Sequence, residues 1–482
     1  MVFSSPLFLF LYLPVVMLGL ILPRLWMRNL WLLFFSVIFY AWGEAAFVIL
    51  VLISTFLNFL LGRWVDHESN PTRRKGAVAI AVVLNIGALV FFKYANFLVD
   101  NLNSLLALAH VTPVHLAPVR LPIGISFVTF HALSYILDIY RRKWPSARNP
   151  ADVALYVFFF PQLVAGPILR WSGIAPQLAQ RVVTRDGFAA GIKRFVNGLA
   201  KKMIIANAVA VPADAIFALP PEQCSTAIAW LGVACYTVQI YFDFSGYSDM
   251  AVGLGKMFGF TFLENFNFPY IARSMTDFWR RWHISLSSWF RDYLYIPLGG
   301  NRFGVARTYF NLLTVFFLCG LWHGASWTFV IWGLYNGAFL ILERTRAGQL
   351  LERLPSPVQH LYLVFTMMVG WLIFRADTFA HALSLFGTMF GQGVGPAVQP
   401  LSRYLTHQVV FALIAGALFS TPIGSLLKQT VQRASAKTSS QSQAHLQTTG
   451  GVLEFILVLA LFAVSCAWLA GSTHNPFIYY RF

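Results

Sequence analysis

Two histidines lie where an imidazole could do acid–base chemistry. The first, His323, is in the apolar run "FFLCGLWHGASWTFVIWGLYNG" at 316–337, with Gly320 and Gly324 on either side. A neutral imidazole can take a proton from a hydroxyl and return it to a leaving group near neutral pH. The glycines permit close backbone approach, or a helix break that leaves the ring beside a cavity. The alternative is a histidine that is merely packed between helices.

The second histidine, His283, is in "RRWHISLSSWF" at 280–290. Residues 278–293, placed on a single helix, divide into an aromatic face and a face of Arg, Ser and Asp, and His283 falls at the boundary. We therefore expect one continuous amphipathic helix at a membrane boundary. Spacing alone favours a histidine that hydrogen-bonds a carbonyl there, and the alternative is a site residue.

Carboxylates in apolar surroundings form a second set of candidates. Asp243 and Asp249 lie in "YFDFSGYSDMAVG" at 241–253, and Asp138 lies in "SYILDIY". Each could orient a histidine, pair with an arginine or bind a cation, and structural ion pairs are their commonest use. The four cysteines form no closely spaced pair, so neither a disulfide framework nor a thiolate metal site is predicted.

The helices that must hold these residues are indicated by composition. The chain has 482 residues, of which 58% are hydrophobic and 11% are charged. One soluble core cannot bury so much apolar surface, and the runs near the span length of about 20 residues predict ten to thirteen helices that cross or enter the bilayer. No repeated strand alternation is present. The predicted class is an all-α polytopic membrane protein with interfacial amphipathic helices.

The basic residues indicate how these helices are oriented. The net charge of +17 falls mostly between the apolar runs, at Arg24 and Arg28, in 63–75 and in 141–143, whereas the turn at 42–46 has no Lys or Arg. The positive-inside rule places these basic loops in the cytoplasm and the amino terminus outside it. Anionic lipid headgroups account for most of this charge, so we predict contacts with membrane lipids and none with nucleic acid.

The chain is predicted to be one membrane domain, 1–482. Within it, 170–202 and 273–307 mix cations with apolar residues at helical spacing and are predicted to be interfacial basic segments. The stretch 428–451 is rich in Ser, Gln and Thr and is predicted to be a flexible cytoplasmic loop.

Several longer blocks resemble a known family. They are "LPIGISF" at 121, "FFPQLVAGPILR" at 159, "YFDFSGYSDMA" at 241, "FWRRWHISLSSWFRDYLYIPLGGNR" at 278 and "GLWHGASWTF" at 320. They resemble the membrane-bound O-acyltransferase superfamily, and within it the bacterial polysaccharide branch typified by the alginate O-acetyltransferase membrane subunit. The resemblance covers nearly the whole chain.

The resemblance implies a fold and a site. The expected fold is a ring of tilted helices around a thinned centre, where a funnel from each side meets at a buried histidine. That histidine matches His323, and the second family histidine matches His283. Both are therefore predicted to be catalytic, and no metal is predicted. The residues predicted to bind the acyl donor are Arg280, Arg281, Trp282, Ser287, Asp243 and Trp322.

The resemblance also implies the reaction. We expect transfer of an acyl group, most simply acetyl, from a cytoplasmic thioester for O-acetylation of an exported polysaccharide such as alginate. The donor would be acetyl-coenzyme A or an acylated carrier protein, with no bound cofactor. Expected partners are a periplasmic serine-dependent acetyltransferase of the SGNH type and the polysaccharide export machinery, at the bacterial inner membrane.

Two alternatives stay open at this point. One is D-alanyl transfer to teichoic acid, which is the same chemistry on another polymer. The other is a transporter of an acylated intermediate, in which His323 and Asp243 would form a proton relay.

Overall fold

The structure, a computed structural model, describes residues 1–393, 399–435 and 440–471. Regular secondary structure within these ranges is entirely helical, which confirms the predicted all-α class. Six segments are long and apolar enough to cross a membrane, and four shorter helices are also apolar, so the chain is a polytopic membrane protein. The six are Leu25–His67, Pro71–Leu108, Thr226–Met257, Gly304–His323, Ser356–Arg375 and Thr448–Gly471.

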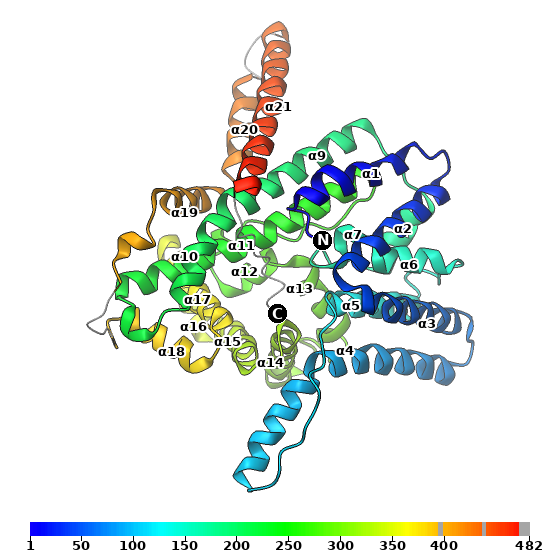
Figure 1. The fold of residues 1–482 in the computed structure, drawn as a ribbon, viewed down its shortest axis with the longest axis horizontal. Helices are drawn as coiled ribbons and strands as arrows, with labels where there is room; N and C mark the ends of the chain where they lie inside the picture. Colours follow the sequence, from blue (N-terminus) through cyan, green and yellow to red (C-terminus); the bar gives the residue numbers. More distant parts are fainter. Residues whose placement is uncertain (394–398, 436–439, 472–482) are drawn as a thin grey trace.

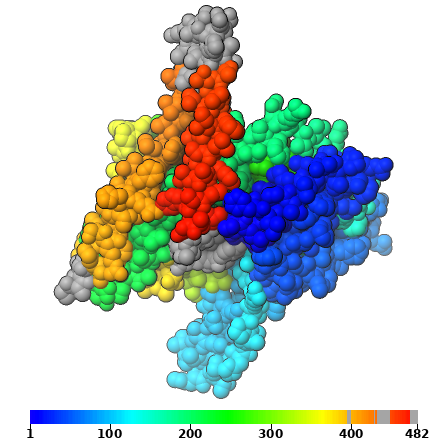
Figure 2. Space-filling view, turned by 45° about the horizontal axis from the view of Figure 1, so that its top comes forward, coloured from blue at the N-terminus to red at the C-terminus, as the bar shows by residue number. Residues whose placement is uncertain are grey.

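Most helices of the first half lie on the same side of the molecule as the amino terminus, and α10 (Asn207–Phe217) lies apart from them beside the helix that follows it (Figure 1). The helices before α10 are α1 (Leu13–Met17), α2 (Leu25–Glu44), α3 (Val48–His67), α4 (Pro71–Leu108), α5 (Ile125–Tyr140), α6 (Pro150–Phe158), α7 (Phe160–Leu163), α8 (Trp171–Ala179) and α9 (Arg185–Ala200). The far part of α4 extends from one edge of the body, as both Figure 1 and Figure 2 show.

The second half begins with the long central helix α11 (Thr226–Met257). It is followed by α12 (Met275–Arg281), α13 (Ile284–Phe290), α14 (Gly304–His323), α15 (Trp327–Leu342), α16 (Arg346–Arg353), α17 (Ser356–Arg375), α18 (Phe379–Thr388), α19 (His407–Phe419), α20 (Ile423–Ser435) and α21 (Ser440–Gly471). Helices α20 and α21 lie side by side and extend from the edge opposite the end of α4 (Figures 1 and 2).

The centre of the fold is α11, whose residues are almost all buried. Glycines let α9 approach it backbone to backbone. A Cβ atom added at Gly191 would lie 2.7 Å from the carbonyl oxygen of Gly253, and one added at Gly198 would lie 2.5 Å from that of Gly246. Only hydrogen side chains fit at these contacts, so the glycines set the spacing of the two helices.

The helix pair that carries His323 is built in the same way. A Cβ atom at Gly320 of α14 would overlap the carbonyl oxygen of Phe329, and one at Gly333 of α15 would overlap that of Phe316. Helix α14 ends at His323, and the chain is extended at Gly324 before α15 begins. The predicted helix break beside His323 is therefore confirmed.

Two basic loops that are distant in sequence meet on one side of the molecule, which we call the basic face. Arg74 Nη2 donates a hydrogen bond to the carbonyl oxygen of Tyr140 at 2.6 Å. Arg142 forms a 3.0 Å ion pair with Asp66. The loops at 63–75 and 141–143 thus lie together, as their common charge predicts.

The start of α2 belongs to the basic face as well. Asn29 Nδ2 donates to the carbonyl oxygen of Leu178 at the end of α8, and Trp171 at the start of α8 donates to that of Pro145. The turn at 42–46 lies at the other end of α2, where Glu44 forms a 3.3 Å ion pair with Arg120. Residues near 120 are therefore on the side opposite the basic face.

The prediction of one continuous helix over 278–293 is wrong. Helix α12 ends at Arg281, His283 adopts left-handed backbone angles of φ 42° and ψ 53°, and α13 begins at Ile284. The physical reason is that Asn265 hydrogen-bonds both the backbone and the side chain of Ser285, and this replaces helical bonds at the break. Periodicity could not predict a break that a residue from another segment stabilises.

The predicted flexible loop at 428–451 is helical in the parts that the structure describes. Residues 428–435 belong to α20 and 440–451 to α21, while 436–439 lie outside the described residues. Gln, Ala and Lys are compatible with helix, and the stretch has no proline to interrupt one. The interfacial placement of 170–202 and 273–307 stays a prediction.

The packing of α14 on α15 yields a testable prediction. Gly333→Ala would place a methyl group against the backbone of α14, and such overpacking costs roughly 1–3 kcal/mol. We expect a lower Tm for the detergent-solubilised protein. Gly87→Ala in α4 is the control, because no atom lies within 4 Å of its added Cβ. Equal Tm values for the two variants would contradict backbone contact at Gly333.

Candidate active site

The side chain of His323 lines a cavity of about 310 Å³. The chain just after Arg120 forms much of the wall, so the cavity lies toward the side opposite the basic face. Its lining residues are Lys93, Leu121, Pro122, Ile123, Gly124, Ile125, Ser126, Phe127, Val164, Trp322 and His323. A solute in this cavity would meet one imidazole and one ammonium group, with otherwise mostly apolar walls.

The end of α14 is held in place by α4. Lys93 Nζ donates hydrogen bonds to the carbonyl oxygens of Trp322 and His323, the latter at 3.2 Å, and the Tyr94 hydroxyl donates to that of Leu321. The last carbonyls of a helix lack intrahelical partners, and a cation there is also favoured by the helix dipole. These bonds fix the backbone that carries the His323 ring.

Sequence reasoning missed Lys93 and Tyr94. The signal was present, because "FFKYANF" at 91–97 places a lysine within an apolar span. The rule that selected His323, that an ionisable residue inside a span has a functional or structural reason, applies to Lys93 equally.

Three aromatic side chains surround the His323 ring. The centroid of the imidazole lies 4.7 Å from that of Trp322, 5.0 Å from Trp332 and 5.1 Å from Phe374, and each pair meets edge to face. These contacts restrict rotation of the ring. Packing therefore orients the imidazole of this cavity-lining residue.

His283 is oriented by Asn265. The Oδ1 atom of Asn265 lies 3.1 Å from His283 Nδ1 and accepts hydrogen bonds from the backbone N–H of Ser285 at 3.1 Å and its hydroxyl at 2.9 Å. A backbone N–H can only donate, so the atom of Asn265 that faces it must be the oxygen. His283 Nδ1 must then carry the proton in its bond to Asn265, and the lone pair of the neutral ring is on Nε2.

Burial keeps this imidazole neutral. His283 is 1% exposed, and desolvation lowers its pKa to about 3. Its ring also packs edge to face on Phe244, with centroids 4.6 Å apart. His283 is therefore a hydrogen-bond acceptor through Nε2 across the physiological pH range, and sequence reasoning missed Asn265, the residue that makes it so.

Trp322 connects the two histidines. Its ring centroid lies 4.7 Å from that of His323 and 6.2 Å from that of His283. The indole N–H is buried and has no hydrogen-bond partner among the residues that the structure describes. A buried donor placed between these two imidazoles is suited to receive an oxygen atom on which negative charge develops.

Four of the predicted donor-binding residues do not line the cavity. Arg280 is exposed, and Arg281 forms a 3.0 Å ion pair with Asp277. The Ser287 hydroxyl donates to the carbonyl oxygen of Trp282 at 3.2 Å. The fourth, Trp282, is buried in an aromatic cluster with its ring centroid 4.9 Å from that of Trp371.

The segment that carries the predicted donor-binding residues, α12 and α13, nevertheless begins and ends at the basic face. Arg141 Nη1 donates to the carbonyl oxygen of Asp292, which follows α13. The carboxylate of Glu343, just past the end of α15, accepts the backbone N–H of Met275 at the start of α12. That end of α15 is the one distant from His323, so α12 and α13 lead from the basic face toward the histidines.

Asp243 does not join the site. Its carboxylate forms a 2.6 Å ion pair with Lys202, and both side chains are buried, beside Val2, Phe3 and Ser4. Asp243 does not line the His323 cavity, and its contact with the donor stays a prediction. The relay between Asp243 and His323 likewise stays a prediction.

Comparison with known proteins identifies the family of the chain. Residues 37–350, more than half of the chain, match the membrane-bound O-acyltransferase family. The chain belongs to this family. The predicted family and the predicted O-acyltransferase class are both confirmed, so the two histidines and Trp322 are candidates for the catalytic centre of a membrane-bound O-acyltransferase.

Individual relatives are also similar over long stretches. The "Probable alginate O-acetylase AlgI" of Azotobacter vinelandii is 41% identical, with 100% of both chains aligned. The "Peptidoglycan O-acetyltransferase" of Helicobacter pylori is 32% identical over 100% of this chain and 98% of its own. The "Teichoic acid D-alanyltransferase" of Bacillus subtilis is 33% identical over 45% of this chain and 58% of its own.

The contact between Asn265 and His283 can be tested by pH dependence. Asn265→Asp keeps the acceptor oxygen but adds a negative charge that stabilises the imidazolium, so it should raise the His283 pKa. If neutral His283 is needed, the acidic limb of the kcat/KM profile moves to higher pH. Asn267→Asp, an exposed position two residues away, should leave the profile unchanged. Superimposable profiles for wild type and Asn265→Asp would refute the role of Asn265.

Proposed function

We propose that the chain transfers an acetyl group from a cytoplasmic thioester to an acceptor hydroxyl, for the O-acetylation of an exported polysaccharide such as alginate. The main support is the position of His323 on a cavity that lies away from the basic face, with Trp322 and His283 behind it. Full-length similarity to proteins named as alginate and peptidoglycan O-acetylating enzymes favours acetyl as the group.

The proposed orientation follows from charge. The positive-inside rule places the basic face in the cytoplasm and the His323 cavity toward the periplasm, in a bacterial inner membrane with a periplasmic amino terminus. A donor made in the cytoplasm would approach along α12 and α13, past Arg280 and Arg281. The acceptor would approach through the cavity. The two substrates then meet at Trp322 from opposite sides.

In the proposed reaction His323 acts as the general base. It takes the proton of the acceptor hydroxyl as that oxygen attacks the thioester carbonyl carbon. The carbonyl oxygen becomes an oxyanion, which accepts a hydrogen bond from the Trp322 indole N–H. When the intermediate collapses, the C–S bond breaks and the departing thiolate receives the proton from His323. The mostly apolar walls exclude water that would hydrolyse the thioester.

The role proposed for His283 is to position the donor. A neutral ring with its proton on Nδ1 cannot donate from Nε2, so it is unsuited to polarising the acyl carbonyl. It can instead accept a hydrogen bond from an N–H group of the donor. This assigns polarisation of the carbonyl to Trp322 and leaves His283 as the acceptor that fixes the donor chain.

The donor is proposed to be acetyl-coenzyme A or an acetylated carrier protein, and the chain itself needs no bound cofactor for this chemistry. The acceptor hydroxyl is proposed to belong to a periplasmic serine-dependent acetyltransferase of the SGNH type, which works with the export machinery. D-alanyl transfer is less favoured, because the similarity to the teichoic acid enzyme of Bacillus subtilis covers 45% of the chain.

The central test is His323→Ala. Removing a general base lowers the rate by roughly 10²–10⁴-fold, and we expect a loss of this size in acetyl transfer from labelled thioester by the purified protein in liposomes. His407→Ala, at an exposed histidine of α19, is the matched control and should retain full activity. Wild-type activity in His323→Ala, at equal protein level and Tm, would reject His323 as the base.

The role of Trp322 is tested by Trp322→Phe, which removes the N–H and keeps an aromatic ring between the histidines. Loss of one oxyanion donor costs roughly 10²–10³-fold in kcat. We expect this loss with little change in KM for the thioester. If Trp322→Phe changes KM alone, the indole binds the substrate in its ground state only. If it lowers the Tm, the role of the indole is in packing.

A further inference from the structure

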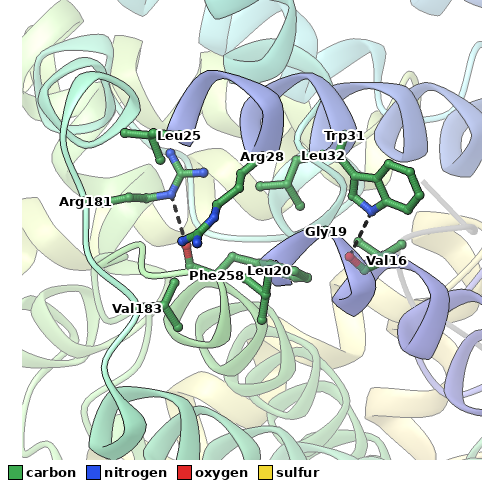
Figure 3. A pocket seen from close by; sticks show the side chains of 10 residues that line it. All are labelled: Val16, Gly19, Leu20, Leu25, Arg28, Trp31, Leu32, Arg181, Val183 and Phe258. Atoms are coloured by element: carbon green, nitrogen blue, oxygen red, sulfur yellow. Dashed lines mark hydrogen bonds between the residues drawn. The ribbon is translucent and has the colours of Figure 1, made fainter. Parts of the chain in front are cut away.

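Two arginines from separate segments line one small pocket at the basic face. Arg28 is near the start of α2, and Arg181 follows the end of α8 (Figure 3). The rest of the lining is apolar apart from backbone, with Leu25 and Val183 among its residues. The pocket is shallow, with a cavity volume of about 10 Å³, so a ligand would lie at its mouth, against the two guanidinium groups. This site is distant in the fold from the His323 cavity and shares no lining residue with it.

Backbone carbonyls hold both guanidinium groups through their Nε atoms. Arg28 Nε donates to the carbonyl oxygen of Leu22 at 2.7 Å, and Arg181 Nε donates to that of Phe258 at 3.0 Å. The Arg181 guanidinium also stacks on the ring of Phe260, 4.1 Å from its centroid. These contacts fix the direction of each side chain, and Figure 3 shows the two guanidinium groups close together.

The positive charge in this pocket is not balanced within the described part of the chain. Neither Arg28 nor Arg181 forms an ion pair with a carboxylate there, in contrast to the buried Lys202, which pairs with Asp243. Burial lowers the pKa of Arg181 to about 10, and the nearby charge of Arg28 adds to this effect. Two adjacent, partly buried cations repel each other unless an anion lies between them.

The start of α2 adds backbone donors to the same place. Leu25, the first residue of α2, lines the pocket, and the preceding Arg24 provides no side-chain cap. The N–H of Met27 donates to the carbonyl oxygen of Arg24, so the N–H groups of Leu25 and Trp26 are the donors that this end of α2 can offer, and the helix dipole places partial positive charge here. Helix starts of this kind bind phosphate groups.

Exposed apolar side chains flank the pocket. Ile21 is 78% exposed, Trp26 is 56% exposed and Val182 is 75% exposed. In a membrane protein such residues face acyl chains, and tryptophan favours the level of the lipid headgroups. A soluble phosphate ester would gain nothing from these apolar neighbours, whereas a lipid would place its headgroup at the mouth of the pocket and its chains along them.

We propose that Arg28, Arg181 and the first turn of α2 bind the phosphodiester headgroup of an anionic phospholipid. The guanidinium groups match the geometry of phosphate oxygens, and one phosphate accepts hydrogen bonds from both arginines. The bound lipid joins the start of α2 to the segment between α8 and α9. This proposal is independent of acyl transfer, because its test measures lipid binding only.

In the test, the full-length protein is released from nanodiscs that contain phosphatidylglycerol and phosphatidylcholine. Native mass spectrometry then measures which lipid stays bound. We expect wild type to retain phosphatidylglycerol preferentially. Arg28→Gln/Arg181→Gln should weaken this retention roughly ten-fold or more, since hydrogen bonds to charged groups are lost. Arg28→Lys/Arg181→Lys keeps the charge but loses the planar forks, so it should retain an intermediate amount.

The matched control is Arg24→Gln/Arg185→Gln. These exposed arginines lie four residues from each pocket arginine, do not line the pocket, and change the net charge equally. Equal retention by the two Gln double variants would overturn the proposal, because charge alone would then explain binding. If coenzyme A or inorganic phosphate displaces the lipid from the wild-type protein, the site takes its phosphate from a soluble ligand, and the proposal of a lipid is overturned. Size-exclusion profiles check that each variant is folded.

Discussion

The candidate site depends on how one helix ends inside the protein. Helix α14 stops at His323 with carbonyl groups that have no helical partners. Lys93 and Tyr94 of α4 supply the missing donors. A buried carbonyl without a partner costs free energy comparable to a lost hydrogen bond, so the end of α14 and this part of α4 must stay together. The position of the His323 imidazole follows from that constraint.

A second helix end places the other imidazole. The chain leaves α12, passes His283 in a left-handed conformation and starts α13, and Asn265 stabilises the turn through Ser285. That conformation is costly for a residue with a side chain and persists because the surrounding bonds determine it. The same Asn265 oxygen sets the tautomer of His283. One amide group thus controls both the backbone and the protonation of the residue.

The sequence predicted the reactive residues better than the residues that support them. His323 and His283 stood out because ionisable groups are rare in apolar segments, and the family blocks contain both. Lys93 obeyed the same rule and could have been found. Asn265 could not, because it acts from a loop eighteen positions before His283 and neither composition nor periodicity shows which distant amide meets a helix break. For the same reason the continuous helix predicted over 278–293 was wrong.

Asp243 and Arg181 show how the surroundings of a charge distinguish its use. Asp243 and Lys202 are both buried and neutralise each other, so their contact stabilises the packing around α11 without needing a ligand. Among the described residues, Arg181 bonds to carbonyl oxygens and stacks on an aromatic ring, with Arg28 beside it. Carbonyl oxygens orient a guanidinium but carry no charge to balance it. An anionic ligand requires a positive charge that the fold orients and does not neutralise. Sequence alone does not reveal such a charge, because the same two arginines would be present if each had an acidic neighbour in the fold.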